Sequence, residues 1–134
     1  GALADRYGKK LLLTVSGITA ALGTMIVVAI PSLPAIYAGG VLIGLATGLF
    51  YAANWALGTE IVPADYDGKF LGISNLAGAG AGAIGAYIGG PIADTLSRIV
   101  PEIPGLGYTV LFSIYGVLFL LSILALKVIN RSAK

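Results

Sequence analysis

Hydrophobic residues in this chain gather in four long runs without a charged residue, and short segments rich in charges or prolines separate these runs. In a helix with a rise of about 1.5 Å per residue, about 20 residues cross the hydrocarbon core of a bilayer, which is about 30 Å thick. None of the runs has the charged face that a helix lying on the membrane surface needs. The pattern therefore predicts four membrane-spanning helices, at residues 11–30, 35–57, 70–93 and 108–126.

The composition is that of a membrane protein. Hydrophobic residues make up 57% of the chain and charged residues only 10%, whereas about a quarter of the residues in a typical soluble domain are charged. The first two runs cannot form one helix, because Pro31 and Pro34 lie between them and resist helix continuation. We expect an all-α, polytopic transmembrane helical bundle that is an excerpt of a longer protein.

Lysine and arginine are distributed unevenly over the segments between the predicted spans. Cytoplasmic loops of membrane proteins carry an excess of these residues, and one side of the predicted bundle holds all of them except Arg98. This asymmetry predicts an integral protein of the cell membrane with both ends of the chain in the cytoplasm. The cytoplasmic segments would be 1–10, 58–69 and 127–134, and the extracytoplasmic segments 31–34 and 94–107.

The residue types in the predicted spans argue against an enzyme. The chain has no histidine and no cysteine, and no charged residue falls inside a predicted span, so neither a nucleophile with its base nor a metal site can be assembled there. A G-x-G-x-x-G match at residues 80–85 lies within an apolar helix instead of following a strand, so it does not indicate a dinucleotide site. We expect no enzymatic activity, no metal, no cofactor and no nucleic-acid partner.

The ten residues in front of the first span, GALADRYGKK, carry a loop motif. They resemble the G-x-L-a-D-r-x-G-r-k signature of the major facilitator superfamily, which joins helices two and three, and again helices eight and nine, of a twelve-helix fold. The resemblance implies helices nine to twelve of a secondary transporter that works by alternating access, with the N-terminal half of the same chain as partner. Helices three to six of the same fold are the alternative register.

The resemblance also implies what the whole protein interacts with. Its partners would be a small-molecule solute, the lipid bilayer, and a coupling proton or sodium ion. The segment 54–63 resembles the sugar–cation symporter branches of the superfamily. Coupling usually needs an ionisable group at membrane depth, and we expect that group in another part of the protein.

In the family, the aspartate of the signature meets a helix N-terminus of the opposite half and latches the outward-facing state. The glycines of such a loop allow a tight reversal, and its cations hold it at the membrane interface. Arg6 is expected to pair with Glu60, because the C-terminal end of a helix dipole opposes an anion. The expected latch residues are Gly1, Asp5, Arg6, Gly8, Lys9, Lys10 and Glu60.

Glycine is concentrated in the second and third predicted spans, where it recurs every three or four residues. This spacing places the glycines on one helix face and lets a neighbouring helix approach closely. We expect these two helices to lie in the interior of the bundle. The first and fourth helices are expected to face lipid with their large side chains, including Phe112 and Phe119. The predicted packing glycines are Gly40, Gly44, Gly48, Gly78, Gly82, Gly85 and Gly89.

A polar stripe runs along the second predicted span. Thr47, Tyr51 and Asn54 fall at positions i, i+4 and i+7, with Trp55 beside them. Hydroxyl, amide and aromatic groups at membrane depth suit a small polar solute, in particular a sugar. We predict that these four residues line the substrate cavity. In the alternative interpretation, the Asn54 side chain forms a hydrogen bond with another helix, and Trp55 belongs to the aromatic belt at the membrane interface.

Two other classes of function fit the composition. One is a channel subunit, and the other is a non-transporting membrane protein that uses its glycine faces to dock and assemble helices. The loop signature favours the transporter, because a channel has no evident need for a latch between two halves.

Overall fold

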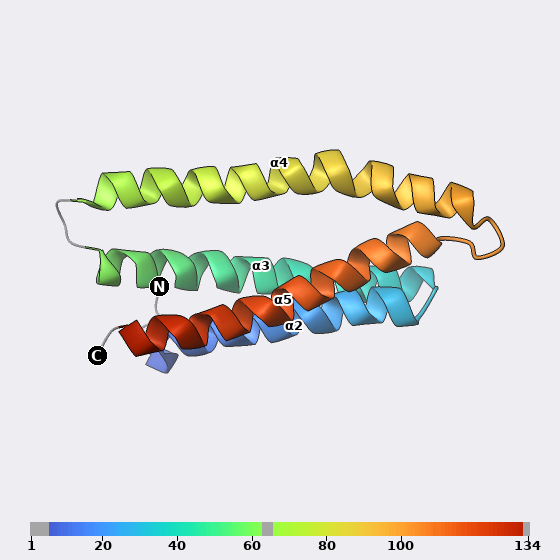
Figure 1. Ribbon diagram of the computed structural model, residues 1–134. Coiled ribbons are helices and arrows are strands. Elements are labelled where there is room, and N and C mark those ends of the chain that lie inside the picture. Colours follow the sequence, from blue (N-terminus) through green and yellow to red (C-terminus); the bar gives the residue numbers. More distant parts are fainter. Residues whose placement is uncertain (1–5, 63–65, 133–134) are drawn as a thin grey trace. The chain divides into compact units, whose positions relative to one another are not determined.

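A computed structural model describes residues 6–62 and 66–132, with the backbone alone for 59–61, 67 and 128–132. Its described residues include no strand, and each long helix among them is long and apolar enough to cross a membrane. Figure 1 shows these helices as continuous ribbons. The predicted all-α membrane fold is therefore confirmed. The helices are α2 (Lys9–Ala29), α3 (Leu33–Ile61), α4 (Asp67–Ile99) and α5 (Leu106–Ser132).

Local sequence sets where the helices begin and end. Ile30 and Val100 each precede a proline and each leave the helical conformation with φ of −124°, because a proline ring disfavours helical geometry in the residue before it. Ser32 caps α3 by accepting a hydrogen bond of 3.4 Å from the Ala35 N–H. Gly105 has φ of 76° and makes the left-handed turn into α5. The turns between helices thus follow from their own residues.

The helix α4 is longer than the sequence pattern predicts. The expected helix 70–93 ends at a Gly-Gly-Pro segment, but the observed helix continues to Ile99 with Pro91 in its interior. A proline removes only one backbone hydrogen bond, and membrane helices tolerate this loss better than most soluble ones. The helix ends instead just before Pro101, because the proline ring disfavours helical geometry in Val100, the residue before it.

This extension changes the expected segment after α4. The segment between α4 and α5 is shorter than the expected loop 94–107, because its first six residues are helical. The apolar helix Gly68–Ile99 also includes Asp94 and Arg98, both close to its C-terminal end, so the expectation that no charge falls inside a span stays a prediction. One carboxylate therefore lies within the last turns of a membrane-length helix.

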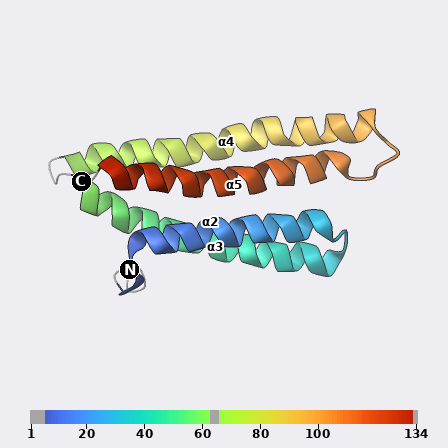
Figure 2. The ribbon, with the colours of Figure 1, turned by 60° about the horizontal axis from the view of Figure 1, so that its bottom comes forward.

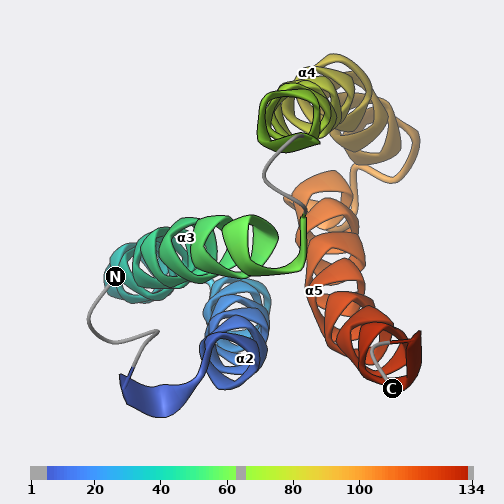
Figure 3. The same ribbon diagram turned by 90° about the vertical axis from the view of Figure 1, so that its left-hand side faces the viewer.

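The chain divides into two compact parts, and the first comprises the residues up to Leu57 together with those from Phe112 onward. Within it, α2 and α3 run antiparallel side by side, as Figures 2 and 3 show. Their backbones approach most closely at Gly23 and Gly39, where a Cβ added to either glycine would lie 2.6–2.8 Å from the carbonyl oxygen of the other. The two glycines hold this helix pair together because no side chain separates the backbones.

The opposite side of α2 packs against α5. A Cβ at Gly17 would lie 2.8 Å from the Ile123 side chain, and one at Gly116 would lie 2.9 Å from the Thr24 hydroxyl. Near the start of α2, Leu13 forms a small core with Ala53 and Leu57, and Leu12 and Leu126 pack against it. The facing positions on α5 are spaced alternately by four and three residues, as in a coiled-coil seam. They are 112, 116, 119, 123 and 126.

The burial of α2 differs from the expected division into interior and lipid-facing helices. Of the four apolar spans in the described part of the chain, α2 has the largest buried share, 39%. The reason is that small residues line both of its contact faces and admit a neighbour on each side. Phe112 and Phe119 are half-buried instead of turned fully outward. The small buried residues of α2 are Ser16, Gly17, Ala20, Ala21, Gly23 and Thr24.

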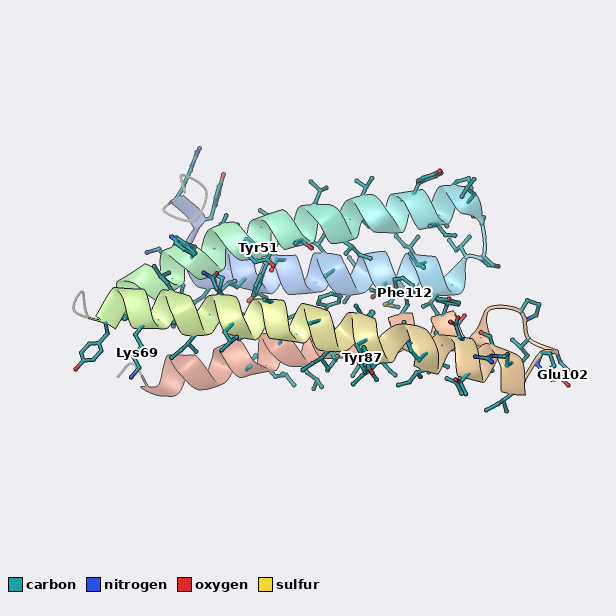
Figure 4. The ribbon with its side chains drawn as sticks, turned by 90° about the horizontal axis from the view of Figure 1, so that it is seen from above. Tyr51, Lys69, Tyr87, Glu102 and Phe112 are labelled. Carbon is teal, nitrogen blue, oxygen red and sulfur yellow. The ribbon has the colours of Figure 1, made fainter. Side chains whose placement is uncertain are left out.

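The second part of the chain, Gly58–Leu111, contains the end of α3, all of α4 and the first residues of α5. In Figure 4, Lys69 lies near the start of α4 and Glu102 just beyond its end, and Tyr87 projects from α4 between them. At about 1.5 Å per residue, the 33 residues of α4 span about 50 Å, more than the hydrocarbon core of a bilayer. At least one end of α4 therefore reaches the membrane interface, unless the helix is strongly tilted.

The glycines predicted to pack against other helices are mostly uncovered by the described residues. A Cβ added at Gly40, Gly44, Gly48, Gly78 or Gly82 would meet no atom within 4 Å, whereas Gly85 is half-buried and Gly89 is buried. The close contacts of the first part are made by other glycines, namely Gly17, Gly23, Gly39 and Gly116. The packing role of the predicted faces stays a prediction about helices outside this chain.

Candidate functional site

A groove crosses the first part of the chain near the middle of its helices. Its volume is about 270 Å³, just below the range of about 300–1,000 Å³ that ligand pockets usually have, so it suits a small solute. We call it the mid-span groove. It is lined by Ser16, Gly17 and Ala20 of α2, by Ala46, Thr47, Phe50 and Tyr51 of α3, and by Phe119 and Ser122 of α5.

The groove lies at membrane depth. Thr47 is close to the middle of the span Leu33–Gly58, and Phe119 is close to the middle of Leu106–Lys127. On α2, Ser16 and Ala20 flank the middle of Lys9–Ala29. These residues therefore lie near the middle of three helices that are long and apolar enough to cross a membrane.

Small residues on α2 create the groove. Since Ser16, Gly17 and Ala20 have little or no side chain, the space above α2 stays open between the larger residues of α3 and α5. Phe50 and Tyr51 contact each other edge to face, with ring centroids 5.8 Å apart, an arrangement that stabilises aromatic pairs. Figure 4 shows Tyr51 on its helix. The wall on the α3 side is therefore aromatic.

The polar groups of the groove are hydroxyls without charge. Ser16 donates to the Leu13 carbonyl at 2.8 Å, Thr47 to the Ile43 carbonyl at 2.8 Å, and Ser122 to the Phe119 carbonyl at 2.6 Å. These donations occupy the hydroxyl protons and leave oxygen lone pairs as acceptors. Tyr51 is 64% exposed, and its hydroxyl makes no hydrogen bond to another residue of the described chain. The groove can thus accept hydrogen bonds from a solute and offer it an aromatic ring.

The structure brings together two of the four predicted cavity residues. Thr47 and Tyr51 both line the mid-span groove, whereas Asn54 and Trp55 do not. Asn54 is half-buried, and Trp55 is 52% exposed near the end of the α3 span. The polar stripe therefore leaves the groove after Tyr51.

Sequence reasoning missed the serine on α2 and the aromatic residue and serine on α5 that complete the groove. Ser16, Phe119 and Ser122 come from helices that the glycine distribution assigned to the lipid side. The alternating spacing along α5 was the available signal, because a seam of this kind marks a helix face that packs against protein.

A second cavity of about 340 Å³ lies between α2 and α5. Apolar side chains form nearly all of its wall, so it offers a polar solute little to bind. Figure 4 shows Phe112 on α5, and this residue lines the cavity opposite Met25 and Val28.

The expected latch is only partly described. Gly1 and Asp5 lie outside the described residues, and so does the side chain of Glu60. Gly8 has φ of 89° at the N-cap of α2, a conformation that glycine adopts readily. The Arg6 guanidinium lies 5.4 Å from the centre of the Tyr7 ring, within the range of a cation–π contact. The Arg6–Glu60 pair therefore stays a prediction.

Among the described residues, no group of three or more histidine, cysteine, aspartate or glutamate side chains could hold a metal ion. The mid-span groove contains no charged residue either. What it can do is bind an uncharged polar molecule through hydroxyls and aromatic faces.

Comparison with known proteins identifies the family. The model of the Major Facilitator Superfamily matches residues 1–134. The minor myo-inositol transporter IolF of Bacillus subtilis (strain 168) is 33% identical over 84 residues, which are 63% of this chain and 19% of that protein. The chain thus aligns with about a fifth of this curated relative. No solved structure matches it significantly. Because the family match covers every residue, the chain is an integral membrane protein of the major facilitator superfamily, a family of transporters and not of enzymes.

Proposed function

We propose that this chain is part of a secondary transporter that moves a small, uncharged polar solute across the cell membrane by alternating access. The observation that carries the proposal is the mid-span groove, in which Thr47 and Tyr51 of one membrane helix lie near half depth without a charged neighbour. Membership in the superfamily supports transport as the general activity.

The solute class follows from the chemistry of the groove. A polyol or sugar ring offers several hydroxyls as donors and apolar ring faces, and the groove offers hydroxyl acceptors beside Phe50, Tyr51 and Phe119. The relative IolF is named as a transporter of myo-inositol, and myo-inositol is a polyol. Asn54 and Trp55 are part of the proposal as residues that meet the solute closer to the cytoplasm.

The remaining features of the proposal concern the whole protein. The chain would supply helices nine to twelve, with both ends in the cytoplasm, and the N-terminal half of the same protein would complete the cavity. The loop before α2 would latch the outward-facing state through Asp5 and the Arg6–Glu60 pair. A proton or sodium ion would drive uptake. Asp94 lies within α4 and is an ionisable group of the kind that coupling to such an ion needs.

Uptake by the full-length protein in lipid vesicles tests this proposal. We expect labelled myo-inositol or a hexose to accumulate when a proton or sodium gradient is imposed, and empty vesicles to show only leakage. We also expect counterflow, in which unlabelled solute inside the vesicles drives transient accumulation of labelled solute, because carriers show it and channels do not. Gradient-independent flux without counterflow would indicate a channel, and no flux of any tested polyol, sugar or drug would favour a helix-assembly protein.

A further inference from the structure

The helix α4 is held at its two ends and uncovered between them, as far as the second part of the chain shows. Near its start, the Phe70 ring occupies the space beside Gly58 of α3. Near its end, the backbone of Ala93 touches Gly107 at the start of α5. Between these contacts, a Cβ added at any of five glycines would meet no described atom within 4 Å. These glycines are Gly72, Gly78, Gly80, Gly82 and Gly90.

Three contacts fix the end of α4 to α5, and we call them the α4–α5 clamp. Ala93 is fully buried, and a side chain at Gly107 would overlap the Ala93 carbonyl. The Gly107 N–H donates a hydrogen bond of 3.3 Å to the Ser97 hydroxyl. The Tyr108 hydroxyl donates one of 2.9 Å to the Asp94 carboxylate. The contacts fall on successive turns of α4, so they fix both the separation and the rotation of the last turns of α4 relative to the first turn of α5.

A weak point precedes the clamp. Gly89, Gly90 and Pro91 follow one another inside α4. Because proline has no N–H, the carbonyl of Tyr87 loses the partner that a regular helix would give it, and glycine is the least restrained residue next to this gap. Figure 1 shows α4 as one ribbon that changes direction in its second half, where these residues lie. Sharp bends in helices occur mainly at such sites.

We propose that the Gly89-Gly90-Pro91 segment is a hinge, and that the clamp makes the end of α4 move with α5 while the rest of α4 stays with the end of α3. In the transporter proposed above, bending here would move the last two turns of α4 without breaking the α4–α5 contacts. Only the effect on uptake rests on the proposed function, because the bending itself can be measured without transport.

Replacing Pro91 by alanine tests the hinge in the full-length protein. Nitroxide labels at Leu76 and Ile99, which are 74% and 69% exposed, would be about 35 Å apart in a straight helix and report the bend as a distance. We expect the distance distribution of the parent protein to shift when myo-inositol or a hexose is added, and Pro91→Ala to hold one distance. Uptake turnover is expected to fall about tenfold while KM changes little.

Two control variants separate a hinge from other roles of the proline. Pro91→Gly keeps the helix easy to bend, so both the distance shift and uptake are expected to survive. Gly72→Ala also stiffens α4, although less than Pro91→Ala, at an uncovered position away from the hinge, and it is expected to behave like the parent.

A distance shift in Pro91→Ala equal to that of the parent would overturn the hinge, whatever happens to uptake. Loss of the shift in both Pro91→Ala and Pro91→Gly would also overturn it, since the ring itself would then be what matters. A parent protein that bends without transporting any polyol or sugar would leave the hinge standing and refute the proposed function.

Discussion

Replacing Gly39 by leucine is expected to separate α2 from α3 and to lower the stability of the folded protein by about 2–3 kcal/mol. A Cβ at this position would lie 2.5 Å from a methyl group of Val27 and 2.6 Å from the Gly23 carbonyl oxygen. The Gly23 oxygen belongs to the backbone, so it cannot move aside without moving α2. The thermal midpoint of the purified full-length protein in detergent measures the effect, together with the fraction that elutes as a single species.

The neighbouring Ala38 provides the matched control for this substitution. Ala38 is small but exposed, so Ala38→Leu creates the same side chain on the same turn of α3 without meeting α2, and it adds only one carbon atom fewer than Gly39→Leu. We expect its midpoint to stay close to that of the parent. Equal midpoints for the two variants would mean that α2 and α3 do not approach as closely at Gly39 as the structure shows.

Replacing Tyr51 by alanine is expected to lower kcat/KM for uptake by about 10–100-fold. The substitution removes a hydroxyl and one of the three aromatic rings that line the mid-span groove. A lost hydrogen bond is worth about 0.5–1.5 kcal/mol and the lost ring contact a similar amount, and about 1.4 kcal/mol corresponds to tenfold. Initial uptake rates over a range of polyol or sugar concentrations measure it.

Two further variants test how Tyr51 acts. Tyr51→Phe keeps the ring and loses only the hydroxyl, so its loss of kcat/KM should be several-fold smaller than that of alanine. Tyr37 is another exposed tyrosine of α3 that lies outside the groove, and Tyr37→Ala is expected to keep nearly full activity. If the Tyr37 and Tyr51 alanine variants lost the same amount, the groove would have no special part in transport.

The membrane fold could be predicted from the sequence because the physical signal is strong. A charge inside a span is costly, so the charge-free runs predict the starts of α2, α3, α4 and α5 to within three residues, whereas α3, α4 and α5 continue four to six residues beyond the ends of their runs. The end of α4 could not be predicted in this way. Proline stops helices in general, and whether one is tolerated depends on neighbours that satisfy the freed carbonyl.

The site was only half visible in the sequence. Thr47 and Tyr51 could be found because they recur on one face of one helix, and a periodic pattern reports such faces directly. Ser16 and Ser122 belong to other helices, and which helices surround a groove depends on tertiary packing. Glycine content alone did not indicate which helices meet within this chain, because single glycines such as Gly17 and Gly116 make closer contacts there than the regular series on α3.

The central claim is that the solute passes along the groove side of α3, and thiol labelling at Thr47 tests it most directly. The chain contains no cysteine, so Thr47→Cys can be labelled with a charged, water-soluble thiol reagent once any cysteines elsewhere in the protein are replaced. Leu118 of α5, which is exposed and lines neither cavity, provides the comparison through Leu118→Cys. We predict that the cysteine at 47 reacts, that myo-inositol or another transported polyol slows its reaction, and that the cysteine at 118 stays unlabelled. An unreactive cysteine at 47, or equal labelling at both positions without protection by solute, would contradict the account.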